Sequence, residues 1–166
     1  MNALFWNVRG ISVAGRKPLI IDTLAKTHAN IIGFQETKKE GFSPSYLKSL
    51  IGHRDFAWHH LPAIGTAGGI LVGVEQDVFE VISWSHLNFS VSCELRHKGL
   101  GHIFRVIVVY GSSYEEGKAV FISELHSLFV DNHLPTLIGG DFNLVRNAKE
   151  KSNGVINHRW SNNFNA

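Results

Sequence analysis

A carboxylate and an amide stand two residues apart at the end of an apolar segment near the C-terminus. Asp141 and Asn143 follow the pair Gly139 and Gly140, which itself follows the apolar residues 137–138. Glycine lets the backbone turn sharply and lets a ligand approach closely, and an aspartate beside an asparagine can share one metal-bound or phosphate-bound water. An ordinary strand followed by an Asx turn would use the same residue types, so this segment alone leaves both interpretations open.

Three other predicted strands also end at a polar residue. Asn7, Glu36 and Tyr110 each come directly after such a segment. Polar groups at the rim of a rigid sheet are held by the core yet remain exposed to solvent, which suits a functional site. If the strands are neighbours, these three side chains and Asp141 converge on one cleft.

The residue types predict metal-assisted phosphoester chemistry at such a cleft. Glu36 with Asn7 and several waters suits Mg²⁺, which prefers hard oxygen ligands and takes few of them from protein; Mn²⁺ is a possible substitute. Asp141 would accept a proton from an attacking water that Asn143 orients, and the Tyr110 hydroxyl would donate to a phosphate oxygen. Taken singly, each residue also fits a turn, a surface charge or a strand terminus.

The elements that must position these residues are read from apolar periodicity and turn residues. We expect one domain, residues 1–166, with an α+β sandwich of two packed sheets and helices outside. The expected strands are residues 3–8, 31–35, 56–60, 69–74, 78–84, 89–95, 103–110 and 136–138. Three helices are expected, each with an apolar stripe that faces the core. The stripes are Ile20, Ile21 and Leu24 in the first helix, Leu47, Leu50 and Ile51 in the second, and Phe121, Leu125, Leu128 and Phe129 in the third.

Local signals refine three of these elements. Ser43 is expected to cap the second helix with Pro44 at its first position, and the pair Ser113 and Glu116 predicts a capping box for the third. Residues 89–95 alternate between apolar and polar side chains, which predicts an antiparallel strand with one exposed face.

Composition indicates a globular protein without covalent cross-links. The 166 residues are 44% hydrophobic and 18% charged, with a formal net charge of +2, which does not by itself indicate a dedicated nucleic-acid binder. Cys93 is the only cysteine, so no disulfide partner exists within the chain and a cysteine-based zinc site is not expected. No signal peptide or membrane-spanning run is apparent, and a soluble intracellular location is the default expectation.

Basic residues stand near the predicted strand ends. Arg9, Lys38 and Lys149 are the candidates for contact with a nucleic-acid backbone, together with Lys39, Arg146 and Lys151. Phosphates attract such side chains, but an ordinary solvated surface would carry them as well. Neither of the two obvious histidine pairs, His59 with His60 and His126 with His133, has the spacing of a natural chelate.

Five short segments together resemble the endonuclease/exonuclease/phosphatase superfamily. They are Trp6–Gly10, Gln35–Lys38, Gly65–Ile70, Val109–Gly111 and Gly140–Asn143. Each is a weak signal alone, but their order and spacing make a chance match improbable. Within the superfamily the chain looks most like the endonuclease domain at the start of plant LINE-type retrotransposon polyproteins.

This resemblance implies a four-layered α/β sandwich that cleaves phosphodiesters of DNA with Mg²⁺, and in the retroelement branch a nuclear location. By the resemblance, Glu36 binds the metal with help from Asn7, Asp141 and Asn143 position the attacking water and the phosphate, and Tyr110 touches the phosphate. Arg9 stands where abasic-site nucleases have an acidic residue, which argues against that branch.

The sequence departs from the family pattern after Asn143. The family has further strands that end in an Asp-His pair, and the chain contains no Ser-Asp-His. We therefore expect a domain that lacks the C-terminal strands and is weakly active or inactive as this fragment. Two alternatives stay open: a degenerate remnant without catalytic activity, and a phosphatase that acts on a small phosphoester. The sequence leaves the oligomeric state open.

Overall fold

The computed structural model describes residues 1–64, 67–130 and 132–166. In these ranges it contains eight strands, four α-helices and one short 3-10 helix. In chain order they are β1 (Ala3–Asn7), α1 (Arg16–Thr27), β2 (Ile31–Gln35), α2 (Pro44–Ile51), β3 (Phe56–Ile64), β4 (Ala67–Glu75), β5 (Phe79–His86), β6 (Ser90–His97), β7 (Ile103–Tyr110), α3 (Glu115–Ser127), β8 (Thr136–Asp141), η1 (Ala148–Glu150) and α4 (His158–Asn165).

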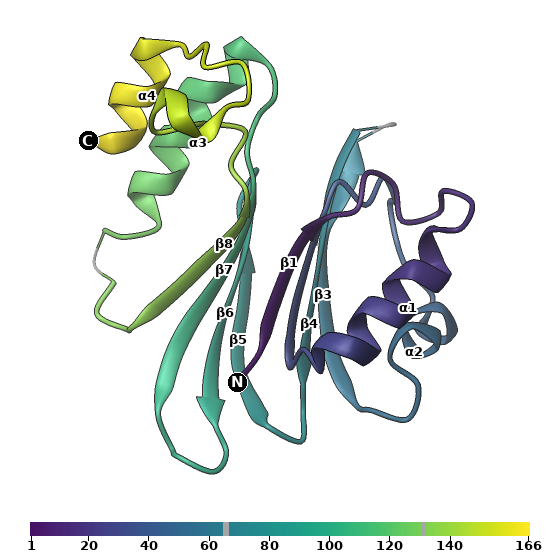
Figure 1. Ribbon diagram of the computed structural model, residues 1–166. Helices are drawn as coiled ribbons and strands as arrows, with labels where there is room; N and C mark the ends of the chain where they lie inside the picture. Colours follow the sequence, from purple (N-terminus) through teal and green to yellow (C-terminus); the bar gives the residue numbers. More distant parts are fainter. Residues whose placement is uncertain (65–66, 131) are drawn as a thin grey trace.

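Two mixed four-stranded sheets pack face to face. The first has the order β1-β2-β4-β3 and the second the order β5-β6-β7-β8. Helices α1 and α2 cover the outer face of the first sheet, while α3 and α4 lie on the side of the second (Figure 1). The predicted α+β sandwich is therefore confirmed. None of the helices in the described ranges is long and apolar enough to cross a lipid bilayer.

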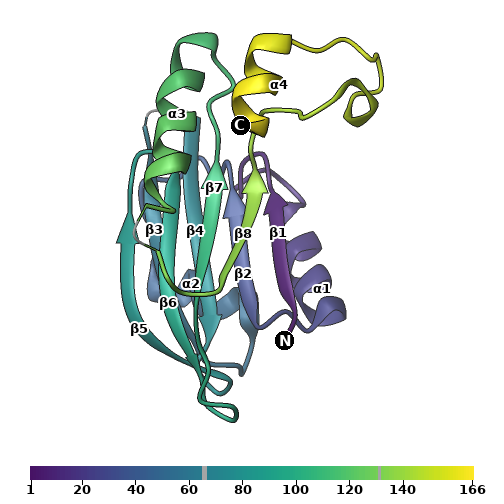
Figure 2. The same ribbon diagram turned by 90° about the vertical axis from the view of Figure 1, so that its left-hand side faces the viewer.

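Each sheet contains one parallel pair, and both pairs have their carboxyl ends at the same end of the sandwich. β1 runs parallel to β2, and β7 runs parallel to β8. Figure 2 shows β8 ending just below α4, with β1 beside it. Because parallel neighbours share a direction, residues that follow β1, β2, β7 and β8 meet at one edge.

The inner faces of the two sheets approach closely at β1 and β8. The Phe5 ring lies against the backbone of Gly139, where a Cβ atom would come within 2.5 Å of the ring. Only glycine permits this approach. The close packing brings the ends of β1 and β8 into hydrogen-bonding range of each other, which the functional site requires.

Several local predictions hold. Ser43 caps α2 by accepting a hydrogen bond from the backbone N–H of Tyr46 (3.2 Å), with Pro44 at the first helical position. Ile20 and Leu24 of α1 are buried, but Ile21 is exposed.

The predicted start of α3 is wrong. The helix begins at Glu115 with Tyr114 as the capping residue, and Ser113 forms no side-chain cap. Instead the hydroxyl of Ser112 accepts a hydrogen bond from the Tyr114 N–H (3.1 Å), and this serine turn competes with the capping box. Phe129, which we expected on the buried stripe, lies beyond the helix and is exposed.

The predicted exposed face of β6 is also wrong. Ser90 and Ser92 are buried. The Ser90 hydroxyl donates to the carboxylate of Glu124 on α3 (2.7 Å), and the Ser92 hydroxyl lies 3.4 Å from the Arg105 guanidinium. Polar partners from neighbouring elements therefore cover a face that the alternating pattern alone assigned to solvent.

Candidate active site

The ends of four strands meet at one edge of the sandwich, so the condition that the sequence left open is met. Asn7 ends β1, and Glu36 directly follows β2. Tyr110 lies opposite Asp141 in the parallel register of β7 and β8. The Asn7 side-chain amide donates a hydrogen bond of 2.7 Å to Oδ2 of Asp141, and this bond joins the two sheets at the site.

The backbone around the site is strained. Apart from glycine, only five residues in the described part of the chain have positive φ, and four of them, Arg9, Glu36, Lys38 and Asn143, follow β1, β2 or β8 (φ 48°, 54°, 56° and 50°). The left-handed region costs about 1–2 kcal/mol for such residues. Strain of this kind persists where the surroundings hold it and is concentrated at functional sites.

Side-chain acceptors hold two of these strained turns. The N–H of Arg9 donates to Oδ1 of Asn7, and the N–H of Asn143 donates to Oδ1 of Asp141, each at 3.0 Å. Asp141 is therefore held from two sides, by the Asn7 amide and by the backbone of its own turn. These two contacts fix the orientation of its carboxylate.

The segment after β7 is fixed to the turn after β8. The Asn143 side-chain amide donates to the Gly111 carbonyl (2.8 Å), and the Gly111 N–H donates to the Asp141 carbonyl (2.8 Å). A Cβ atom on Gly111 would lie 2.1 Å from the carbonyl oxygen of Phe142. Only glycine fits here, so Tyr110 and Asp141 keep a fixed relation to each other.

The two acidic groups dominate the electrostatics of the site. Burial raises the pKa of Glu36, but hydrogen bonding from Lys38 and the nearby Asn7 amide, with the charges of Lys38 and Arg9, outweighs it, and the net pKa lies below the ordinary value. Burial, followed by the negative charges of Glu36 and Asp141, raises the pKa of Tyr110 to about 12. Glu36 is thus ionised and Tyr110 protonated at neutral pH.

These residues suit a Mg²⁺ ion better than an ion that needs several protein ligands. Within residues 1–64, 67–130 and 132–166, no three His, Cys, Asp or Glu side chains cluster as metal ligands. Mg²⁺ commonly takes one or two carboxylates and keeps several waters, and the ionised Glu36 with the amide oxygen of Asn7 could hold it in this way. Lys38 lies 3.0 Å from one Glu36 oxygen and would compete with an ion for it.

A cleft extends from these polar groups. Glu36, Lys38 and Tyr110 line it together with residues of β3 and β4, the β5–β6 turn and the segment after β7. Its volume is about 550 Å³. Gly65 and Thr66, which belong to one of the family-like segments, lie outside the described residues.

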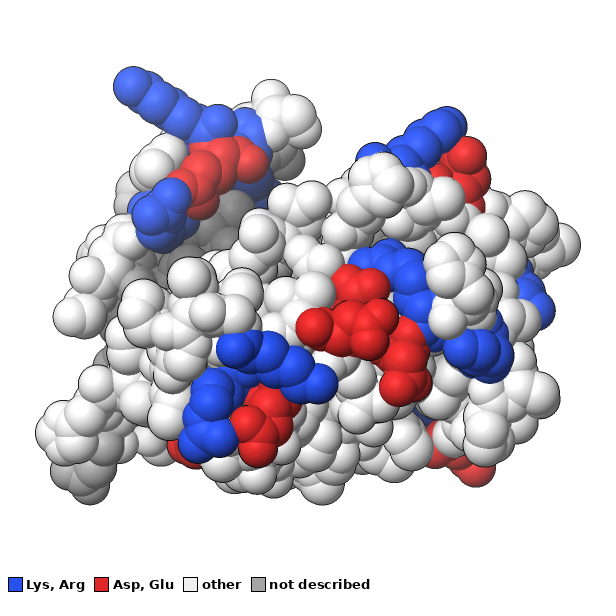
Figure 3. All heavy atoms as spheres, turned by 90° about the horizontal axis from the view of Figure 1, so that it is seen from below, with Lys and Arg blue, Asp and Glu red and all other residues white. Residues whose placement is uncertain are grey.

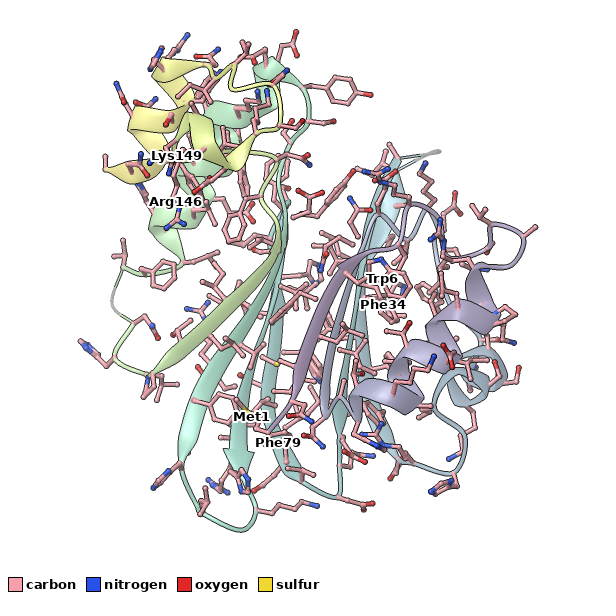
Figure 4. The ribbon with its side chains drawn as sticks, in the orientation of Figure 1. Met1, Trp6, Phe34, Phe79, Arg146 and Lys149 are labelled. Atoms are coloured by element: carbon pink, nitrogen blue, oxygen red, sulfur yellow. The ribbon has the colours of Figure 1, made fainter. Side chains whose placement is uncertain are left out.

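The predicted basic contacts are divided between the two sides of this edge. Arg9 and Lys38 belong to the turns after β1 and β2. Lys149 lies with Arg146 near α3 and α4, on the side of the second sheet, whereas Trp6 and Phe34 mark the ends of β1 and β2 (Figure 4). Arg146 is paired with Glu150 (3.1 Å). The structure therefore does not bring Lys149 together with Arg9 and Lys38.

The opposite end of the sandwich carries charges of both signs side by side (Figure 3). Arg54 pairs with Glu75, and Arg96 pairs with Glu80, each at 2.7 Å. Paired charges of this kind give no continuous basic surface for a phosphate backbone.

Sequence reasoning missed three residues that shape the cleft. Ser112 fixes the segment after β7, Tyr114 forms part of the cleft wall, and Glu124 anchors the β5–β6 turn from α3. Glu124 could have been found from the sequence, because it is a charged residue next to Leu125, among the positions of the helix that are buried. The other two lie in a loop, where no periodicity marks them.

Solved structures with similar folds include proteins from several organisms. The catalytic domain of human Nocturnin aligns with a TM-score of 0.66 and 17% identity, covering 87% of this chain and 64% of that one. A mannosyl-6-phosphatase from Bacteroides thetaiotaomicron aligns with a TM-score of 0.66 and 14% identity, covering 99% and 69%. D. rerio TDP2 complexed with a single strand DNA product gives 0.65 and 15%, covering 87% and 61%.

At these identities the likeness shows the fold alone, and the chain spans about two thirds or less of Nocturnin and TDP2. No curated protein sequence matched the chain. The sequence does match the family described as "Endonuclease/Exonuclease/phosphatase family" over residues 4–165. The four converging strand ends are thus those of a chain that belongs to the endonuclease/exonuclease/phosphatase family.

Proposed function

We propose that the chain is a Mg²⁺-dependent phosphodiester hydrolase that acts on DNA, of the type found at the start of plant LINE-type retrotransposon polyproteins. The hydrogen bond between Asn7 and Asp141 carries the proposal, because it joins residues 134 positions apart beside Glu36 and Tyr110. Family membership and the five family-like segments support the same chemistry.

In this proposal Glu36 holds the metal with the amide oxygen of Asn7. The bound ion supplies Lewis-acid activation of the phosphoryl group and offsets charge that develops on it. Asp141 accepts the proton of the attacking water, and Asn143 keeps the turn that orients this carboxylate. Tyr110 donates its hydroxyl hydrogen bond to a phosphate oxygen, and its raised pKa keeps the donor protonated.

The rate of this 166-residue chain should be low. The chain contains no Ser-Asp-His, the segment that by the family resemblance would supply a histidine as an acid at the phosphate. Such an acid typically accelerates a reaction by about 10²–10⁴-fold. Binding of the metal should be less affected, because Glu36 and Asn7 are in place.

Nicking of supercoiled plasmid DNA with Mg²⁺ tests the proposal. Glu36→Gln and Asp141→Asn should abolish nicking, while Glu80→Gln, at the far end of the sandwich, should leave it unchanged. As a readout independent of rate, Mg²⁺ should raise the melting temperature of the wild type but not of Glu36→Gln. Nicking that survives both site variants would refute the proposed site.

The same preparations should be tested on small phosphoesters, such as a sugar phosphate. Faster hydrolysis of these than of DNA would favour a phosphatase. A chain that neither cleaves any phosphoester nor gains stability with Mg²⁺ would match a non-catalytic remnant.

A further inference from the structure

The cleft beside Glu36 and Tyr110 has room for more than a phosphate. Its volume of about 550 Å³ falls within the usual range of ligand pockets, about 300–1,000 Å³. Away from the two polar groups, much of its wall is apolar or aromatic and includes Leu61, Ile70, Phe89 and Tyr114. The substrate group that enters this part must therefore present an apolar face.

Tyr114 gives this wall an exposed aromatic ring on a fixed backbone. The residue is 71% exposed. The Ser112 hydroxyl accepts from the Tyr114 N–H (3.1 Å) and donates to the Tyr114 carbonyl (3.0 Å). Gly111, just before Ser112, is held against the turn after β8. A ring on such a support can stack on a ligand without first having to order its loop.

A buried carboxylate fixes Phe89, another residue of this wall. Glu124 on α3 accepts hydrogen bonds from the N–H groups of Asn88 (2.9 Å) and Phe89 (3.0 Å). The carbonyl of Phe89 in turn accepts from the N–H of Tyr110 (2.9 Å). Through these contacts the apolar wall keeps a constant position relative to the site proposed for the phosphate.

We propose that this part of the cleft binds one nucleobase, unstacked from its neighbours and adjacent to the cleaved phosphate, with Tyr114 as its stacking partner. The inference rests on the proposed function, which places the phosphate at Glu36 and Tyr110. Every base offers a π face to an aromatic ring, and Lys38 adds a cation at the same cleft. A base in an intact duplex is already stacked, so single-stranded or frayed DNA is the preferred form.

Binding of two fluorescent oligonucleotides tests this subsite. One is a short oligo(dT), and the other has the same length but lacks every base; fluorescence anisotropy is measured with Ca²⁺ in place of Mg²⁺ to suppress cleavage. The wild type should bind oligo(dT) about 10-fold more tightly, the scale of one stacked base. Tyr114→Phe should keep this preference and Tyr114→Ala should lose most of it. Leu100→Ala, in the exposed β6–β7 turn, is the control.

Equal binding of the two oligonucleotides by the wild type would overturn the inference, as would an unchanged preference in Tyr114→Ala or tighter binding of an intact duplex. Circular dichroism checks the fold of each variant, and Tyr114→Leu replaces Tyr114→Ala if the latter is unfolded, because leucine keeps apolar bulk without an aromatic face. The two proposals fail on different measurements. Absence of Mg²⁺-dependent cleavage on every substrate would refute the proposed function, whereas the binding comparison alone can refute the nucleobase subsite.

Discussion

Asn7 has a second role that its residue type alone does not reveal. Its amide nitrogen bonds to Asp141 and its oxygen accepts the N–H of Arg9. The side chain therefore orients the proposed proton acceptor and also supports the strained turn after β1. Because the Asn7 amide is a neutral donor, the two carboxylates of Glu36 and Asp141 lie at one edge of the sandwich without a third negative charge beside them.

Replacement of this donor by an acid should make stability depend on the metal. In Asn7→Asp two carboxylates would lie at hydrogen-bonding distance, and the Asp141 oxygen would lose its donor, which costs about 1–3 kcal/mol. We expect a lower melting temperature at neutral pH and partial recovery with Mg²⁺, measured by thermal unfolding. Asn153→Asp is the control, since its side-chain oxygen accepts the Val155 N–H in an exposed turn. A variant as stable as the wild type without Mg²⁺ would contradict this role.

Gly111 affects the geometry of the same site because it has no side chain. In Gly111→Ala the new methyl group would meet the Phe142 carbonyl oxygen at 2.1 Å. Overpacking of this kind typically costs about 1–3 kcal/mol, and we expect this loss in urea unfolding together with reduced nicking. Gly41→Ala, where no atom lies within 4 Å of the new Cβ, should unfold like the wild type. Equal stability of the two variants would show that the turn after β8 can move.

At the scale of elements, edge strands β3 and β5 are joined across the sandwich by two histidines. The His59 ring stacks on Trp84 with centroids 5.2 Å apart, and its Nε2 lies 3.1 Å from Nδ1 of His86. A hydrogen bond between these two nitrogens forms only when one of them carries a proton and the other accepts it. The bond is lost when both of the facing nitrogens are protonated. Burial, followed by the charges of His86 and His60, lowers the pKa of His59.

This contact predicts a loss of stability in mild acid. Since the pKa of His59 is lower in the folded chain than the unfolded value of about 6.5, the unfolded state binds more protons as the pH falls below that value. The free energy of unfolding should therefore fall with pH from about 6.5 downward. His59→Phe, which keeps a ring against Trp84, should flatten this dependence in urea titrations. His102→Phe, an exposed position, should not; an equal change in both would rule out the pair as the cause.

The positions of the helices and strands along the chain were largely predictable from the sequence. Which of their faces are buried, and where they begin and end, was less predictable. β2 and β7 have the predicted bounds because uninterrupted apolar runs between turn residues are a local signal. The start of α3 was missed because Ser112 and Ser113 both offer a hydroxyl, and only the loop conformation decides which one is used. The buried face of β6 was missed because Glu124 covers it from a helix distant in sequence.

The whole molecule has an apolar groove on the side of α3 and α4. Ile122, Leu125, Phe129, Ile138, Phe142 and Phe164 line it, and its volume is about 650 Å³. Val130 also lines it and is 68% exposed. Phe129 and Val130 are both exposed here, and adjoining exposed apolar side chains can take part in association.

We expect this chain to associate as its concentration rises, which sedimentation velocity would measure. Val130→Lys should weaken the association, because a charge at the groove would have to be desolvated. Val155→Lys is the matched control, since Val155 is 66% exposed and is not among the groove residues. A wild type that stays monomeric at all concentrations, or an equal effect of both variants, would contradict the role of the groove.

The sequence by itself determined where the strands lie, which polar residues end them and which family the pattern resembles. These are local properties, set by apolar periodicity, turn residues and short motifs. Only the tertiary structure decided that four strand ends meet at one edge, that Asn7 bonds to Asp141 across the two sheets, and that Tyr114 and Phe89 complete the cleft. Those relations depend on strand pairing and sheet packing between residues far apart in the chain, which no local pattern specifies.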